Sequence, residues 1–231
     1  PKRYYPCGSL AGHILGAVTI DDDGLEGIER YDNATLMGEP GFEEFIRDAG
    51  GNRIWLVADK YRPARDGCSI IITIDAVLQQ VVEKILADVV DKYTPESACA
   101  IVMDPRSGDI LAWANWPMVD PNRFGSCPPE SRRNRAITDP FEPGSVFKPF
   151  VASAALEANV VRWDERIFCH NGQRQIGRRT LRDHHGYGEL TFKEIVAYSS
   201  NIGMSYLGER LGNARMCEVV RNFGFGETTG I

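Results

Sequence analysis

No apolar run in this 231-residue chain approaches the roughly 20 residues that a membrane-spanning helix needs. Positive charge is also scarce, because 26 Lys and Arg residues stand against 32 Asp and Glu residues and leave a net charge of −6. Nucleic-acid-binding proteins usually carry a basic patch, so this balance argues against a nucleic acid as partner. A signal peptide and an initiating Met are missing too, and we therefore expect a piece of a longer protein.

The six cysteines show no CxxC spacing and are too sparse for a small scaffold held by disulfides. They are Cys7, Cys68, Cys99, Cys127, Cys169 and Cys217. Their even number permits disulfides in an oxidising compartment, but the sequence indicates no pairing. We expect them to be mostly buried free thiols.

Possible metal ligands gather in one irregular stretch, CHNGQRQIGRRTLRDHHGYGEL. Cys169, His170, Asp183, His184 and His185 could ligate zinc, but their spacing fits no standard zinc pattern. We therefore predict no metal and no other cofactor. We expect Asp183 and His184 to make hydrogen bonds that hold a glycine-rich loop beside a cleft.

Residues 1–66 are rich in Gly and Asp, which predicts short strands and turns with one helical segment near residues 25–31. Residues 60–67, KYRPARDG, are typical of a linker. The next stretch, SIIITID at residues 69–75, predicts a strand, and Asp75 is suited to cap a helix after it. The apolar residues of that helix form one stripe, which we expect to pack on a large surface. They are Val77, Leu78, Val81, Val82, Ile85, Leu86, Val89 and Val90.

Further along, the turn DPRSGD between two apolar stretches predicts a β-hairpin. Residues 145–158 read as a helix. The stretch TFKEIVAYSSNIGMSYLGERLG predicts two helical segments, with Thr191 as the N-cap of the first and Glu194 at the capping-box position.

Ser145 and Lys148 form an S-x-x-K pair at the start of the helix predicted over residues 145–158. Unpaired backbone N–H groups and the helix dipole favour negative charge there, and Lys148 lies one turn on, on the same face. In a dry cleft, burial favours the neutral amine, which can take the serine proton and make the serine a nucleophile. Eleven serines and six lysines give about 0.3 such pairs by chance, so the pair alone favours a helix cap and a solvated lysine.

A second motif, SSNIG, supplies Ser199 and Asn201. A hydroxyl near a Ser–Lys pair can relay a proton to a leaving amine, and an amide can hold a substrate carbonyl or fix the lysine. Alone, the triplet would indicate a helix-capping pair. With S-x-x-K it is similar to the penicillin-binding set S-x-x-K, S-D-N and K-T-G, with Ser200 in place of the Asp.

The stretches RNRAITDPFEPGSVFKPF, RTLRDHHGYGELT and SSNIG…FGFGETTGI resemble class B penicillin-binding proteins, the monofunctional transpeptidases of bacterial cell-wall synthesis. PARDGCSIIITIDAVLQQVVEKIL and AIVMDPRSGDILAWANWP resemble the start of their catalytic domain, whereas AGHILG and GLEGIERYD resemble the non-catalytic region before it. The resemblance implies an α+β fold of the penicillin-binding transpeptidase and β-lactamase kind, an antiparallel sheet with helices. It places a small β-rich, non-catalytic region at residues 1–66 and the first part of the transpeptidase domain at residues 67–231.

The resemblance also implies a reaction. Ser145 would attack the bond between the two terminal D-alanines of a peptidoglycan stem peptide, and an amine of a neighbouring strand would resolve the acyl-enzyme into a cross-link. Lys148 would be the base, Ser199 and Asn201 the second motif, and β-lactam antibiotics would acylate the same serine. The resemblance further implies a membrane anchor and a catalytic domain on the periplasmic side of the membrane. It also implies partners among membrane glycosyltransferases and division or elongation proteins.

The third motif of the set is absent, since no lysine of the chain is followed by Ser-Gly or Thr-Gly. That motif supplies one oxyanion-hole donor, so we expect these residues to be inactive alone. Two alternatives stay open. One is a serine β-lactamase, which usually lacks the long N-terminal region, and the other is a non-catalytic β-lactam sensor.

Overall fold

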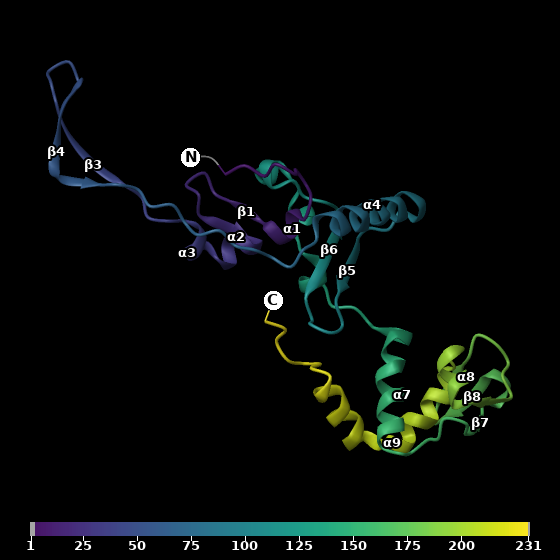
Figure 1. The fold of residues 1–231 in the computed structure, drawn as a ribbon. Coiled ribbons are helices and arrows are strands. Elements are labelled where there is room, and N and C mark those ends of the chain that lie inside the picture. The colour runs from purple at the N-terminus through teal and green to yellow at the C-terminus, as the bar shows by residue number, and fades with distance from the viewer. Residues whose placement is uncertain (1–2, 231) are drawn as a thin grey trace. The chain divides into compact units, whose positions relative to one another are not determined.

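The structure, a computed structural model, describes residues 3–230, and within them the side chains of residues 55–59 fall outside the description. The chain forms two compact units, Pro1–Pro140 and Phe141–Ile231, called unit one and unit two below (Figure 1). Each unit combines helices with two-stranded antiparallel sheets, as the predicted α+β class requires. This division by packing does not test the predicted boundary between residues 66 and 67, which stays a prediction.

Unit one begins with strand pairs and short helices. The helical segment predicted near residues 25–31 is present at Gly27–Tyr31, but two further short helices and a ten-residue strand, Arg53–Arg62, which enters the predicted linker, were not predicted. Its elements are α1 (Gly12–Leu15), β1 (Ala17–Val18), β2 (Gly24–Glu26), α2 (Gly27–Tyr31), α3 (Asn33–Leu36), β3 (Phe42–Arg47), β4 (Arg53–Arg62), α4 (Ala76–Tyr93), β5 (Ala98–Met103), β6 (Ile110–Trp116), the 3₁₀ helix η1 (Pro121–Ser126), α5 (Pro129–Arg132) and α6 (Arg135–Thr138). Three antiparallel pairs, β1–β2, β3–β4 and β5–β6, make up its sheets.

The centre of unit one is α4 packed on the hairpin β5–β6, and both were predicted. Asp75 caps α4, since its Oδ1 accepts hydrogen bonds from the N–H groups of Val77 and Leu78, each 2.9 Å long. Gln79 is buried and joins helix to strand: its Oε1 accepts from the N–H of Trp113 at 2.7 Å and its Nε2 donates to the carbonyl of Trp113 at 2.8 Å. A buried amide that meets both backbone groups of one strand residue fixes the helix against the strand.

Two expectations for this region are wrong. Residues 69–75 form no strand. Only two of their groups donate to strand β6: the Thr73 hydroxyl to the carbonyl of Ile110 and the Asp75 N–H to the carbonyl of Leu111. Two such bonds do not make the ladder of backbone hydrogen bonds that a β-strand needs. The apolar stripe of α4 is also not buried as a whole, because only one side of the helix packs against β6. Leu86 and Val90 are buried, whereas the exposed row consists of Val77, Val81, Ile85 and Val89.

The cysteines are free thiols, as expected, but only Cys169 is buried. Cys127 is half-buried, and Cys7, Cys68, Cys99 and Cys217 are exposed. The expectation of mostly buried thiols is therefore wrong. Cys99 illustrates the reason, since it lies on the face of β5 where alternate residues are exposed.

Unit two places two helices against each other. Its elements are η2 (Gly144–Phe147), α7 (Lys148–Glu157), β7 (Arg166–Phe168), η3 (His170–Gly172), β8 (Gln173–Ile176), β9 (Arg179–Arg182), β10 (Glu189–Thr191), α8 (Phe192–Ala197) and α9 (Asn201–Asn222). The antiparallel pairs are β7–β10 and β8–β9. Helices α7 and α9 pack together (Figure 1), and the small buried side chains of Ala152, Ala154 and Ala155 allow their close approach.

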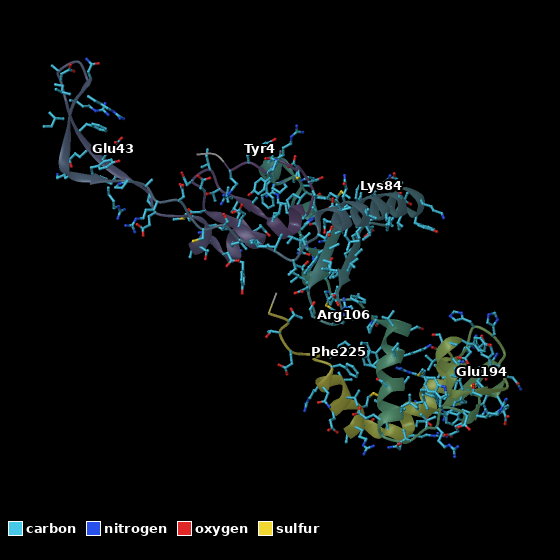
Figure 2. All side chains as sticks on the ribbon, viewed as in Figure 1. Tyr4, Glu43, Lys84, Arg106, Glu194 and Phe225 are labelled. Atoms are coloured by element: carbon cyan, nitrogen blue, oxygen red, sulfur yellow. The ribbon has the colours of Figure 1, made fainter. Side chains whose placement is uncertain are left out.

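The predicted capping box at the start of α8 is confirmed. Thr191 Oγ1 accepts from the N–H of Glu194 at 3.2 Å, and Glu194 Oε2 accepts from the N–H of Thr191 at 2.8 Å. Glu194 is labelled in Figure 2. Phe192 and Ile195 of α8 are buried in the core of unit two. The cap therefore fixes the entry of the helix that leads into the SSNIG motif.

None of the helices in residues 3–230 is long and apolar enough to cross a membrane.

Gly203, in the first turn of α9, has no room for a side chain. A Cβ atom there would lie 2.6 Å from Cγ1 of Ile195, which is fully buried and cannot move aside. We expect Gly203→Ala to lower the free energy of unfolding by about 1–3 kcal/mol through overpacking, measured by urea unfolding followed on unit two. Gly208→Ala is the matched control on the same helix, because its Cβ would meet Met216 Cε at an ordinary 3.7 Å. The control should gain up to about 1 kcal/mol from helix propensity, and equal stabilities of the two variants would contradict the packing argument.

Candidate active site

Ser145 and Lys148 lie on consecutive pieces of one helical segment. The expected helix starts as the 3₁₀ turn η2, which holds Ser145, and Lys148 is the first residue of α7. Gly144 has a φ of 54°, a left-handed conformation that glycine adopts without strain, and it turns the chain into the segment. Residues three apart are eclipsed in a 3₁₀ turn, so Ser145 and Lys148 lie on the same side. Ser145 is exposed and Lys148 is half-buried.

Four phenylalanines fix this turn to the chain after α9. Phe147 lies between the serine and the lysine in sequence, and its ring packs edge-on against Phe225 with 5.4 Å between centroids (Phe225 is labelled in Figure 2). Phe150, on the next turn, contacts Phe223 at 4.8 Å and Phe225 at 5.1 Å. Such pairs contribute about 0.5–1.5 kcal/mol each beyond their buried area, so they hold η2 and α7 in place.

Lys148 joins the two sequence motifs. Its Nζ donates to the carbonyl oxygen of Ser199 at 2.5 Å and to Ser199 Oγ at 2.9 Å. The structure thus brings Lys148 and Ser199 together, whereas among the described residues no hydrogen bond joins the Ser145 hydroxyl to Lys148. A neutral amine has two N–H bonds and one lone pair, and both N–H bonds can be used here. The lone pair is then the part of the amine that can accept a proton.

Ser199 lies between α8 and α9 in a left-handed conformation, with a φ of 56°. Few residues other than glycine adopt this conformation, and its cost has to be offset by the surrounding contacts. The N–H of Ser199 donates to the carbonyl of Val196, and the N–H of Ser200 donates to the carbonyl of Ile195. This bend turns both the carbonyl and the hydroxyl of Ser199 to the same amine.

Asn201 begins α9, and its amide is held from a third segment. Its Nδ2 donates to the carbonyl of Arg182 at 2.8 Å, and its backbone N–H donates to Asp183 Oδ1 at 2.5 Å. The Asp183 side chain therefore makes hydrogen bonds as expected, although to the start of α9, whereas toward the glycine-containing stretch its backbone N–H donates to the carbonyl of Gly172 at 3.0 Å. For His184, which is exposed, the described residues provide no side-chain hydrogen bond, so the expectation for His184 is wrong.

Burial lowers the pKa of the Lys148 ammonium below its ordinary value, and the negative charge of Asp183 acts in the opposite direction. Burial disfavours the charged amine because the ammonium loses hydration, whereas a nearby carboxylate favours it. A lowered pKa increases the fraction of neutral amine at a given pH. The site can therefore supply a base at a lower pH than an exposed lysine could.

Two of the residues considered as possible zinc ligands, Cys169 and His170, make other contacts. In the described part of the chain no group of three His, Cys, Asp or Glu residues is gathered to hold a metal ion. Cys169 Sγ lies 3.6 Å from Ser200 Oγ, and burial raises the pKa of this thiol, which keeps it neutral. His170 Nε2 pairs with the Tyr206 hydroxyl at 2.6 Å.

The family described as "Penicillin binding protein transpeptidase domain" matches residues 98–231, more than half of the chain. The chain belongs to this family. Among curated penicillin-binding relatives, it is 37% identical to Stage V sporulation protein D of Bacillus subtilis over 99% of its own length and 36% of that protein. It is 38% identical to the probable peptidoglycan D,D-transpeptidase PenA of Neisseria gonorrhoeae over 97% of its length and 39% of that protein. The resemblance to class B penicillin-binding proteins is confirmed.

A solved penicillin-binding transpeptidase has the same fold. Penicillin-binding protein 3 of Mycobacterium tuberculosis, in complex with aztreonam, superposes with a TM-score of 0.82 and 31% identity over all of this chain and 48% of that one. The predicted penicillin-binding transpeptidase fold is therefore confirmed. The chain spans less than half of the length of each of these three relatives.

Proposed function

We propose that the protein containing these residues is a serine acyltransferase that cross-links peptidoglycan stem peptides ending in D-Ala-D-Ala. The observation that carries the proposal is the double hydrogen bond from Lys148 Nζ to Ser199, with Lys148 three residues after Ser145, in a chain of the penicillin-binding transpeptidase family. The names of the relatives, among them PenA, a probable peptidoglycan D,D-transpeptidase, support the choice of reaction.

The proposed reaction gives one role to each of these side chains. Ser145 Oγ attacks the carbonyl carbon of the penultimate D-alanine while its proton passes to the Lys148 amine. The C–N bond to the terminal D-alanine breaks, and the Ser199 hydroxyl, which accepts a hydrogen bond from Lys148, relays a proton to the departing amine. An amine of a second stem peptide then attacks the ester carbon, a new amide forms, and Ser145 Oγ regains its proton.

Asn201 and the backbone complete the proposed site. The Asn201 amide donates to the carbonyl of Arg182, which orients it for a substrate carbonyl or for the lysine. The N–H of Ser145 lies at the start of the helical segment, where it can act as one oxyanion donor. Aztreonam in the complex of the M. tuberculosis relative supports a β-lactam as the second type of acyl donor at Ser145.

Substrate and fold together suggest the place of action. We propose that the whole protein acts at the outer, periplasmic side of the bacterial cell membrane, where D-Ala-D-Ala stem peptides are joined. The proposed partners are a membrane glycosyltransferase, which supplies the glycan strands, and the proteins of division or elongation. The name of one relative, a probable peptidoglycan D,D-transpeptidase, supports a role in peptidoglycan synthesis.

The test is turnover with two donors. The intact protein, incubated with a pentapeptide ending in D-Ala-D-Ala and an acceptor amine, should release one D-alanine for each transfer product formed, measured by mass spectrometry. With a chromogenic penicillin it should instead accumulate a stable acyl-enzyme. Rapid hydrolysis of penicillin without accumulation would indicate a β-lactamase, and a stable adduct without any peptide turnover would indicate a sensor.

A further inference from the structure

The carboxylate of Asp183 is the point on which the second motif converges. Asp183 follows strand β9, and its Oδ1 accepts from the N–H of Asn201 at 2.5 Å and from the N–H of Ile202 at 3.1 Å. Its Oδ2 accepts from the hydroxyl of Ser200 at 2.6 Å. Three consecutive residues of the chain thus each donate one hydrogen bond to the same carboxylate.

These bonds complete the N-terminus of α9. The Ser200 hydroxyl, which donates to Asp183, accepts from the N–H of Gly203 at 2.9 Å, and the N–H of Ser200 itself donates to the carbonyl of Ile195 at 3.0 Å. Together with the two bonds to Asp183 Oδ1, all four unpaired N–H groups of the first turn have acceptors. Hydrogen bonds to an ionised group are roughly twice as strong as neutral ones, and a negative charge is favourable at this end of a helix.

The residue held just before this cap is Ser199, the partner of Lys148. Its left-handed backbone turns its carbonyl and hydroxyl to Lys148 Nζ, and the chain immediately after it is bound to Asp183. A shift of Ser200 and Asn201 would move both acceptors of the lysine. The Asp183 charge also acts on Lys148 directly, since it favours the ammonium form.

We infer that Asp183 is a positioning residue of the acyl transfer: it holds Ser199 and Asn201 in register with Lys148 and sets the charge that the lysine experiences. This inference rests on the proposed function, because it assigns a role to Asp183 in that reaction. Asp183 touches neither Ser145 nor Lys148 through a hydrogen bond among the described residues. It acts through the start of α9 and through its charge.

The inference predicts a change in pH dependence. Within the described residues Asp183 is the charged group that acts on Lys148, and the Cys169 thiol behind Ser200 is kept neutral by burial. Removal of the carboxylate charge leaves burial unopposed, which lowers the pKa of Lys148 further. Because the neutral amine is the active form, the acid limb of the rate profile then moves to lower pH.

Two variants of the intact protein separate the effect of the Asp183 charge from the effect of its position. The second-order rate constant for acylation by nitrocefin is measured as a function of pH and normalised to the number of titrated active sites. Asp183→Asn keeps the shape and removes the charge, so its acid limb should move to lower pH. Asp183→Glu keeps the charge and displaces it by one methylene, so its plateau should fall by up to about 100-fold without a shift of the limb to lower pH. Asp164→Asn is the control, since Asp164 is an exposed carboxylate of the same unit and its loss should change neither quantity.

The outcomes distinguish the two proposals. If the unaltered protein is not acylated at Ser145, the proposed function fails and the role of Asp183 falls with it. If the unaltered protein is acylated but both Asp183 variants keep its acid limb and its plateau, the proposed function stands and the positioning role is overturned. If a variant instead has fewer titratable active sites per molecule, while the sites that remain show the wild-type dependence of rate on pH, Asp183 has only a structural role and the inference is also overturned.

Discussion

Replacement of Ser145 by alanine in the intact protein should abolish covalent labelling by a fluorescent penicillin. In the proposed mechanism the adduct forms on the hydroxyl oxygen of Ser145, and alanine has no such oxygen. Loss of the nucleophilic serine of a serine protease lowers kcat by about 10⁶-fold, so labelling should fall below detection in a gel assay. Peptide mapping of the unaltered protein should place the adduct on Ser145.

Ser153→Ala is the matched control, because Ser153 is an exposed serine of the same helix whose hydroxyl donates to the carbonyl of Phe150. This variant should label as the unaltered protein does. An adduct on another serine, together with undiminished labelling of Ser145→Ala, would refute the assignment of the nucleophile.

Lys148→Ala should slow acylation by about 10²–10⁴-fold, the usual contribution of a general base. Lys148→Arg should be almost as slow, although it keeps the positive charge and the reach to Ser199, because a guanidinium cannot lose its proton in a protein. Stopped-flow acylation with nitrocefin measures both rates. In the unaltered protein the rate should rise with pH through the pKa of Lys148, which burial places below that of an ordinary lysine.

The control for the lysine is Lys193→Ala, which removes an exposed lysine from α8 of the same unit. Its acylation rate should be unchanged. A Lys148→Arg variant with wild-type acylation would show that a fixed positive charge is sufficient, and the role of Lys148 as a base would then be wrong.

Local signals in the sequence predicted the elements that are specified by neighbours in the chain. The Thr191–Glu194 capping box, the Asp75 cap and the hairpin turn between β5 and β6 each depend on residues a few positions apart. Such pairs meet in almost any fold that forms the element, which is why spacing alone predicts them.

Contacts between distant segments were not predictable in the same way. Gln79 meets Trp113 across 34 positions, and Asp183 meets Asn201 across 18, with no spacing rule that relates them. The left-handed φ of Ser199 occurs where Lys148 and Asp183 bind the chain from distant positions, and the sequence Ser-Ser-Asn alone does not require it. For residues 69–75 the β-branched composition indicated a strand, but a strand also needs a paired neighbour along its length, which composition does not report.

The pairing of Lys148 with Ser199 across 51 positions has a consequence during synthesis of the protein on the ribosome. Ribosomes add about 5–20 residues per second, so the nucleophile turn emerges roughly 3–10 s before its partner exists. Closing so long a loop costs entropy that only the packed unit offsets, which delays this contact relative to the local turns. A nascent chain that ends shortly after Lys148 should therefore not be acylated by penicillin. Penicillin labelling would then report only on chains in which unit two has folded.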